Sequence, residues 1–523
     1  MAVDTLSVPG RAGDAPHVVI VGGGITGLAA AESLERAIRA GVPVRYTLIE
    51  ATPRLGGKIL TERVGPFLVE GGPDSFVAQK PWAADLARAL GLGPQLTEAA
   101  TVRQATWVLH RGRPRPMPVG MQLIVPTQAG PFVASPLLSP LGKLRMALDL
   151  VIPPRPPGGD ESLAAFIRRR FGQEALERLA EPLMGGIHSA DPERQSLLAT
   201  FPRFRELELR HGGLIRGMRA VQQRIAQDGG RRANAGYARF LRRPRQHGFR
   251  LPPPVVDHRP PAAGAAPFLT LRGGLGTLVA ALEARIGGRT LLGRRVVSLA
   301  AATAGGPPYR LWLDDGAMLE ADAVILATPA VAAADLVAPF APSLAAEVRA
   351  IRYASTGIVT LAYRRAEIGQ PLDGFGLIIP RGEGRAINAI TLTSQKFPGR
   401  APDDHLLLRV FVGGARTPEA LALDDERLLA LARAELRAIF GIAAAPVLSR
   451  VHRWENGNPQ YDVGHLDRVA RIERLAPEGL TLCGAAYGGV GIPDCVRQGQ
   501  EAAARALALV GRLAAGTRPT QIA

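Results

Sequence analysis

The chain has 523 residues, 47% of them hydrophobic, and no run of eighteen or more uncharged apolar residues predicts a membrane-spanning helix. Only two cysteines occur and paired metal-ligand motifs are absent, which excludes a disulfide framework and favours a reducing cytosol. The net charge of +17 leaves four interpretations open: a nucleic acid, an anionic lipid, an acidic small substrate, or a compositional bias toward arginine. In chain order, residues 1–15 come first; they lack an apolar signal core, and we expect a disordered leader.

The segment HVVIVGGGITGLAAAESLE, residues 17–35, predicts a strand, a glycine-rich turn and a helix. Gly22, Gly24 and Gly27 occupy the G-x-G-x-x-G positions, which serve a tight turn, close approach of a pyrophosphate and packing of helix on strand. A second predicted strand, RYTLIE, ends at Glu50, twenty-three residues after Gly27, where a carboxylate can bind a ribose hydroxyl. The combination predicts a dinucleotide-binding unit.

Two further loops indicate which dinucleotide is bound. ATPRLGGKI follows Glu50 directly, and FLVEGGPDSF comes next, at residues 67–76. A plain nicotinamide-binding domain needs no second glycine-arginine loop, whereas a larger ligand does, because its ring system lies further along the crevice. Together with the first glycine loop, and in the same order along the chain, these two segments resemble the FAD-binding fold of the flavin amine-oxidase superfamily. We therefore expect FAD rather than NAD.

The middle of the chain alternates between strand-like and helical patterns. Residues 97–121 are strand-like and basic, and residues 136–150 and 162–183 have helical periodicity. Residues 228–267 combine arginine and proline without an apolar period; we expect a flexible insertion, with a nucleic-acid or lipid contact as the alternative. GIVTLAYRR, FGLIIPR, AINAITLTS and HLLLRVFVGG then predict four strands of an antiparallel sheet.

This order of elements predicts an α/β protein with interleaved domains. A Rossmann-like FAD-binding domain of the amine-oxidase type is expected together with an α+β substrate domain and a helical subdomain. The FAD-binding domain takes three parts, residues 16–96, 268–335 and 451–512. The substrate sheet is expected at 336–450, the helical subdomain, a candidate for membrane docking, at 97–227, the flexible insertion at 228–267, and a tail at 513–523.

Three separated motifs narrow the family. GVGIPDC (489–495), RWENGNPQYDVGH (453–465) and GGPDSF (71–76) resemble segments of bacterial protoporphyrinogen/coproporphyrinogen oxidases of haem biosynthesis, as do PLMGGIHSADPE and FLTLRGGLGTL. The resemblance runs from about residue 17 to 512, with the insertion outside it. It implies FAD- and oxygen-dependent, six-electron oxidation of coproporphyrinogen III, or of protoporphyrinogen IX, with release of hydrogen peroxide. An amine oxidase or carotenoid desaturase of the same superfamily is the second hypothesis, and a basic flavoprotein that binds nucleic acid or membrane is the third.

The resemblance also implies residues that contact FAD. Hydride transfer to the flavin needs no catalytic side chain, so we expect neither a catalytic residue nor a metal ligand. The pyrophosphate is expected at Gly22, Gly23, Gly24, Ile25, Thr26 and Gly27, and the ribose at Glu50. The residues expected along the flavin side are Arg54, Leu55, Gly56, Gly57, Lys58, Gly72, Pro73, Asp74 and Ser75. The adenine is expected at the backbone of Val296, and the border of the isoalloxazine at Trp454, Val490, Gly491 and Ile492.

Substrate contacts are less clearly marked. Phe411 and Gly186 stand where the family lines the macrocycle, with a core residue and a turn glycine as the plain alternatives. Lys80 and Arg103 are candidate cations for the propionates, with solvated surface charges as the alternative. Thr106 occupies a place where mitochondrial relatives have an arginine, which favours recognition of the bacterial type.

The expected partners are a porphyrinogen and O₂, in the cytoplasm, with a peripheral position at a membrane and a ferrochelatase as family-level expectations. Pro136, Leu137, Leu138 and Leu141 form either an apolar docking edge or a core helix. No nucleic acid is expected, and the oligomeric state is not predicted.

Overall fold

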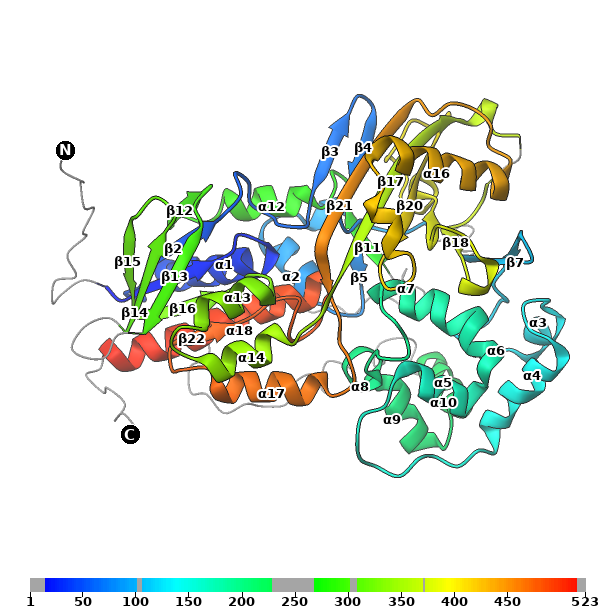
Figure 1. The fold of residues 1–523 in the computed structure, drawn as a ribbon, viewed down its shortest axis with the longest axis horizontal. Helices are drawn as coiled ribbons and strands as arrows, with labels where there is room; N and C mark the ends of the chain where they lie inside the picture. Colours follow the sequence, from blue (N-terminus) through cyan, green and yellow to red (C-terminus); the bar gives the residue numbers. More distant parts are fainter. Residues whose placement is uncertain (1–14, 101–105, 228–267, 302–307, 370–371, 515–523) are drawn as a thin grey trace.

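The computed structural model describes residues 15–100, 106–227, 268–301, 308–369 and 372–514 (Figure 1). The predicted insertion at 228–267, Arg103 and almost all of the leader and tail lie outside the described residues. Figure 1 shows a parallel-sheet domain at one end of the molecule, with a second sheet and a helical subdomain at the other. The predicted α/β class with interleaved segments is confirmed, since the parallel sheet takes strands from three distant parts of the chain.

The parallel sheet has the strand order β12-β2-β1-β16-β22. Neighbours run parallel, with Val19 opposite both Thr47 and Val324. A central parallel strand is apolar on both faces because it is covered on both faces, and β1 is buried throughout. The strands are β1 (His17–Val21), β2 (Arg45–Glu50), β12 (Arg289–Leu292), β16 (Ala323–Leu326) and β22 (Leu480–Leu482).

Alternate residues of β1 enter two different hydrophobic cores. Val18 and Ile20 pack with helices α1 and α18 on one face, whereas Val19 and Val21 pack with α13, α14 and a small antiparallel sheet on the other. The first layer contains α1 (Ile25–Arg39), α2 (Trp82–Ala89), α12 (Gly276–Glu283) and α18 (Ile492–Ala514). The second contains β13 (Val296–Ala301), β14 (Tyr309–Leu313), β15 (Met318–Ala321), α13 (Ala330–Val337), α14 (Pro342–Arg349) and α17 (His465–Leu475).

The second large sheet has seven strands, in the order β21-β17-β20-β19-β18-β7-β8. The four predicted strands lie within it and pair antiparallel, as expected. The basic strands β7 and β8 join the same sheet through a parallel pairing of β7 with β18. Its strands are β7 (Thr106–His110), β8 (Arg113–Pro116), β17 (Tyr353–Arg364), β18 (Gly376–Ile378), β19 (Ala389–Thr391), β20 (His405–Gly413) and β21 (Leu448–Pro459), and α16 (Asp425–Phe440) covers one face.

The helical subdomain forms a core of its own around Phe166, Phe171 and Phe204. Serine side chains cap its helices: Ser162 accepts a hydrogen bond from the N–H of Ala165 at the start of α5. Its elements are α3 (Ala129–Ala134), α4 (Pro140–Ala147), η2 (Leu148–Leu150), α5 (Leu163–Phe171), α6 (Gln173–Ala175), η3 (Leu176–Gly185), α7 (Gly186–His188), α8 (Leu197–Thr200), α9 (Pro202–His211) and α10 (Leu214–Gln227).

The structure separates the two interpretations of the apolar stretch at residues 136–141. Leu137 and Leu138 are buried in the core of the helical subdomain, whereas Leu141 on α4 is 78% exposed. The apolar edge is therefore formed from Leu141 onward and not by the two preceding leucines. No helix among the described residues combines the length and apolar character that crossing a membrane requires.

Candidate active site

The first glycine loop follows β1 and enters α1 in a geometry that only glycine permits at two positions. Gly22 has a φ of +108°, and a Cβ at Gly27 would overlap the carbonyl oxygen of Gly22. Gly24, by contrast, has open space where a Cβ would stand, and it begins α1 with no side chain capping the helix. An uncapped helix N-terminus behind an open glycine is suited to a phosphate anion, as the pyrophosphate of FAD requires.

Glu50 lies at the end of β2 beside this loop. One carboxylate oxygen accepts a hydrogen bond from the backbone N–H of Gly23 at 2.7 Å, and the other accepts from the N–H and hydroxyl of Thr52. The chain leading into β13 passes close by, since the N–H of Arg294 donates to the carbonyl of Glu50. Val296 begins β13 two residues after Arg294 and therefore lies close to the backbone of Glu50. An adenosine contact is expected in this neighbourhood.

The second loop, residues 54–58, packs directly on the first. The N–H of Gly56 donates to the carbonyl of Gly23 at 2.9 Å, and a Cβ at Gly57 would come within 3.1 Å of the Gly24 Cα. Arg54 donates to the carbonyls of Leu55, Gly57 and Ile59, so its guanidinium shapes the loop. The Lys58 ammonium donates to the carbonyl of Gly457, and burial lowers the pKa of this lysine.

The third segment, residues 71–75, lies between this loop and the second sheet. A Cβ at Gly72 would overlap the carbonyl oxygen of Lys58, so only glycine fits there. The indole N–H of Trp454 on β21 donates to the carbonyl of Gly71 at 2.8 Å. Trp454 and Gly72, which the sequence places 382 residues apart, are thereby part of one site.

Asp74 is the charged centre of the third segment. Its carboxylate lies 3.2 Å from the ammonium of Lys396 in α15 (Thr393–Lys396) and 3.2 Å from the guanidinium of Arg409 on β20, and it accepts from Ser75. Burial by itself would raise the pKa of this carboxyl, but the two cations outweigh burial and hold the pKa well below its usual range. Asp74 is therefore an anion at neutral pH.

Residues 490–492 lie at the start of α18. This helix crosses α1 closely, since a Cβ at Gly499 would overlap the carbonyl oxygen of Thr26. The crossing brings Val490, Gly491 and Ile492 to the same end of the sheet as the first glycine loop. Three segments near the N-terminus and one near the C-terminus thus converge at one edge of the parallel sheet, and their glycine geometry and free helix terminus fit FAD.

One face of the second sheet is directed at this edge. The register pairs Thr356 with Trp454, Ile358 with Phe411 and Thr360 with Arg409, so these side chains share a face. Arg409 also donates to the carbonyl of Gly72, and its guanidinium lies 5.1 Å from the centroid of the Phe411 ring. Phe411 therefore stands on the face of the sheet that is directed at the Gly71–Ser75 segment.

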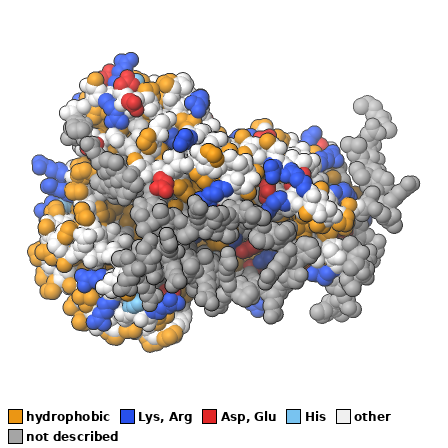
Figure 2. Space-filling model, turned by 180° about the vertical axis from the view of Figure 1, so that it is seen from behind, with side chains coloured by type: hydrophobic (Ala, Val, Ile, Leu, Met, Phe, Trp, Pro, Cys, Tyr) orange, Lys and Arg blue, Asp and Glu red, His pale blue; other side chains and the backbone are white. Residues whose placement is uncertain are grey.

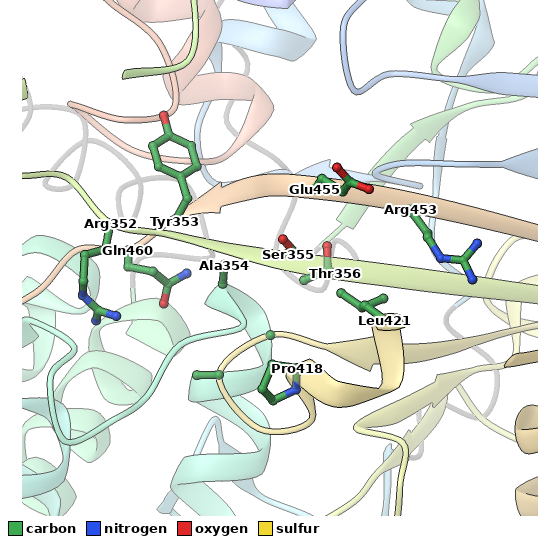
Figure 3. Close-up of a pocket in the computed structure, with 12 residues that line it drawn as sticks. Arg352, Tyr353, Ala354, Ser355, Thr356, Pro418, Leu421, Arg453, Glu455 and Gln460 are labelled. Atoms are coloured by element: carbon green, nitrogen blue, oxygen red, sulfur yellow. The ribbon is translucent and has the colours of Figure 1, made fainter. Parts of the chain in front are cut away.

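A cavity of about 420 Å³ adjoins that face (Figure 3). Figure 3 shows its residues coming from the start of β17, the end of β21 and η6 (Pro418–Ala422). Thr356 belongs to both the cavity lining and the face of Trp454. Arg453 and Leu421, which also line it, belong to the opposite face of the sheet, the one that α16 covers, so the cavity lies at the end of the sheet nearest the helical subdomain.

The predicted substrate residues have different surroundings. Lys80 pairs with Asp494 at the start of α18, with 2.6 Å between Nζ and Oδ2, so its charge is already compensated. Gly186 is exposed at the start of α7, and a Cβ there would meet open space. Sequence reasoning missed Arg409 and Lys396; an arginine inside the apolar run HLLLRVFVGG was the signal for the first, and Lys396 had none.

Comparison with known proteins places the chain in a family. The model of the flavin containing amine oxidoreductase family matches residues 25–507. The coproporphyrinogen III oxidases of Bacillus subtilis and Propionibacterium freudenreichii are 36% and 38% identical to it, covering 94% and 96% of this chain and 98% and 92% of their own length. A crystal structure of a protein from Exiguobacterium sp. 255-15 is 32% identical, with a TM-score of 0.77, and covers 94% of this chain and 98% of its own.

The chain therefore belongs to the flavin-containing amine oxidoreductase family. It is an FAD-dependent oxidoreductase, and the predicted cofactor is confirmed.

Proposed function

We propose that this protein oxidises coproporphyrinogen III to coproporphyrin III at the expense of O₂, with protoporphyrinogen IX as the alternative substrate. The observation that carries the proposal is the similarity, over 94–96% of the chain, to two coproporphyrinogen III oxidases.

The reaction removes six electrons in three two-electron steps. Each step takes a hydride from a meso carbon of the macrocycle and releases a proton to water, while one O₂ becomes one H₂O₂. Over the three steps the released protons come, in sum, from two pyrrole nitrogens and from the fourth meso carbon. When bound, FAD supplies the hydride acceptor and the site at which O₂ takes up the electrons. Conjugation in the product drives the reaction, so the protein's own task is to bind and orient its ligands.

The described residues divide this task between them. The first glycine loop and the N-terminus of α1 bind the pyrophosphate, and Glu50 binds the ribose. Trp454 and Arg409 hold the Gly71–Gly72 backbone in place through hydrogen bonds to its two carbonyls. Phe411 and Thr356 supply the surface over which the macrocycle is oriented. No side chain is needed as a base for the protons that leave to water.

We also propose that the helical subdomain docks the protein on a membrane surface. Leu141 and Leu144 on α4, Leu148 on η2 and Val151 directly after η2 follow helical spacing and are 78, 63, 42 and 72% exposed. Figure 2 shows hydrophobic side chains gathered at the outer edge of this subdomain, interspersed with Lys and Arg. An apolar stripe beside cations is suited to the surface of anionic lipid.

Vesicle sedimentation tests the docking proposal. We expect the wild type to sediment with phosphatidylglycerol vesicles and the L141S/L144S variant to remain in the supernatant. Val331→Ser, at a 45% exposed valine on α13 of the parallel-sheet domain, is the matched control and should sediment like the wild type. Equal sedimentation of all three proteins would place the contact elsewhere.

A cytoplasmic location with a ferrochelatase as the receiver of the porphyrin completes the proposal. Its support is the family resemblance alone. Titration of the purified protein with a ferrochelatase of the same cell, followed by porphyrin fluorescence anisotropy, tests it: transfer faster than free diffusion supports a complex, and transfer at the diffusive rate speaks against one.

Aerobic turnover of the purified holoprotein tests the function itself. Coproporphyrinogen III and protoporphyrinogen IX are supplied separately, porphyrin formation is followed by fluorescence, and the flavin spectrum is recorded on the same sample. Faster porphyrin formation from coproporphyrinogen III supports the proposal. Bound FAD with no porphyrin above the rate without enzyme would overturn it and bring amines or polyenes forward as substrates.

A further inference from the structure

Arg416 lies on the loop that joins β20 to η6, next to residues that line the 420 Å³ cavity. Its two preceding residues, Gly414 and Ala415, line that cavity. The loop also reaches the helical subdomain, because the N–H of Ala415 donates to the carbonyl of Ser189, directly after α7. Arg416 therefore stands where the second sheet, the cavity and the helical subdomain meet.

The loop that carries Arg416 is firmly held. The side-chain amide of Asn388 donates to the carbonyl of Gly413 at 2.7 Å, the N–H of Gly413 donates to the Thr417 hydroxyl at 3.0 Å, and the N–H of Gly414 donates to the carbonyl of Ser355 at 2.7 Å. A braced loop holds its side chains in one place without help from a ligand.

The Arg416 guanidinium is buried without being satisfied. Its side chain is 9% exposed, and neither Nε nor Nη1 has a hydrogen-bond partner among the described residues. The carboxylate of Glu181 on η3 lies 3.7 Å from Nε, within ion-pair range but too far for a hydrogen bond. Buried donors without partners are rare in folded proteins and mark places where a ligand or function is expected.

The charges around Arg416 leave it in need of an anion. Burial lowers the pKa of Arg416, Glu181 counteracts this, and the neighbouring Arg381 in η5 (Arg381–Glu383) reinforces it. Burial likewise raises the pKa of Glu181, which Arg416 only partly offsets. The Glu181 carboxylate thus lies near the guanidinium groups of both Arg416 and Arg381. Its distance from Arg416 is too long for a hydrogen bond, so these two buried side chains do not satisfy each other.

We propose that Arg416 anchors a carboxylate side chain of the substrate at the junction of the cavity with the helical subdomain. The inference rests on the proposed function, since coproporphyrinogen III carries four propionates. A planar guanidinium whose Nε and Nη1 have no partner is matched to a carboxylate, which it binds through charge-assisted hydrogen bonds. Neither Lys80, which Asp494 already neutralises, nor Gly186 offers this chemistry.

Substitutions at Arg416 in the FAD-loaded protein test the proposal. We expect Arg416→Gln to raise KM for coproporphyrinogen III about tenfold or more, with kcat within about twofold, since a charged hydrogen bond is lost from binding. The Kd for the product coproporphyrin III, read from porphyrin absorbance without turnover, should weaken by the same factor. Arg416→Lys keeps the charge and should recover part of both effects.

Controls separate an anchor from a structural arginine. Arg427→Gln, at a 74% exposed arginine on α16, should leave KM and Kd unchanged. FAD content and melting temperature are measured for every variant. Protoporphyrin IX has two carboxylates instead of four, so its Kd should change less than that of coproporphyrin III in Arg416→Gln.

Three outcomes overturn the inference in distinguishable ways. If the wild type turns over coproporphyrinogen III and Arg416→Gln retains wild-type KM and Kd, only the anchor is wrong. If the wild type neither turns over a porphyrinogen nor binds coproporphyrin III, the proposed function fails and the anchor fails with it. A loss of FAD or a lowered melting temperature with unchanged Kd would make Arg416 structural.

Discussion

The guanidinium of Arg409 lies 3.2 Å from the carboxylate of Asp74, and both side chains are almost fully buried. Arg409 belongs to the second sheet and Asp74 to the segment that follows β4 (Phe67–Glu70), 335 residues earlier in the chain. A buried ion pair of this kind is costly to break, because each partner left alone is an uncompensated charge. The pair therefore joins the Gly71–Ser75 segment to the second sheet.

Asp74→Asn tests that connection. The change leaves Lys396 and Arg409 buried without their anion, so we expect a loss of about 3 kcal/mol in the free energy of unfolding and a lower FAD content. Chemical denaturation and the flavin absorbance of the purified protein measure the two effects. The control Glu193→Gln breaks the exposed pair with Arg168 and should cost less than about 1 kcal/mol. Similar losses in both variants would contradict the argument.

The first glycine loop allows binding of FAD to be separated from folding. Gly24→Ala places a methyl group into open space, at a φ of −69° that alanine accepts, so the stability of the apoprotein should change little. The FAD pyrophosphate is expected in that space, and FAD affinity should fall at least about tenfold. Gly27→Ala instead forces a methyl group onto the Gly22 carbonyl and should destabilise the apoprotein as well. Fluorescence titration of apoprotein with FAD distinguishes the two.

Substitution of Lys80 tests the sequence prediction that this lysine binds a propionate of the substrate. If it binds a propionate, Lys80→Met raises KM for coproporphyrinogen III. Its ion pair with Asp494, at 2.6 Å, favours a different result: a small loss of stability at the start of α18 with little change in KM. Steady-state kinetics and melting temperature on the same preparation decide between the two roles.

The geometry of the glycine loops was predictable because each is a short local motif in which the spacing of glycines is itself the requirement. Gly22 to Gly27 and Gly56 to Gly57 need no knowledge of the rest of the chain. Arg409 and Lys396 were missed because their role depends on Asp74, which lies more than 300 residues away. Which charged residues a fold brings together is decided by strand register, and a single sequence does not show it.

The same limit applies to the apolar residues of the helical subdomain. Helical periodicity predicted α4 and α5, and both exist, but it could not separate Leu138 in the core from Leu141 at the surface. Residues 97–121 were predicted as strand-like, and β7 and β8 lie within them, whereas the place of β7 beside β18 was not predicted, because strand propensity carries no information on the partner. Patterns therefore predicted the elements, and tertiary packing decided which face and which neighbour.

The last prediction concerns stability against pH. His17 on β1 is 4% exposed, with Nδ1 2.6 Å from the carbonyl of Glu320 and Nε2 2.9 Å from the Thr47 hydroxyl. Burial, reinforced by the charge of Arg45, lowers the pKa of His17 from 6.5 to about 4. Below pH 6.5 His17 becomes protonated in the unfolded chain but stays neutral in the folded protein. The free energy of unfolding therefore decreases as the pH is lowered, and the loss is complete near pH 4.

This histidine should contribute up to about 3 kcal/mol to that loss. We expect the urea midpoint of the wild type to be flat above pH 7 and to fall between pH 6.5 and 4. His17→Gln retains a polar side chain without the titration and should show a shallower fall, although its stability at pH 7 is lower. His465, whose pKa is also lowered to about 4, maintains part of the slope in that variant. Parallel pH profiles for wild type and His17→Gln would show that His17 does not contribute.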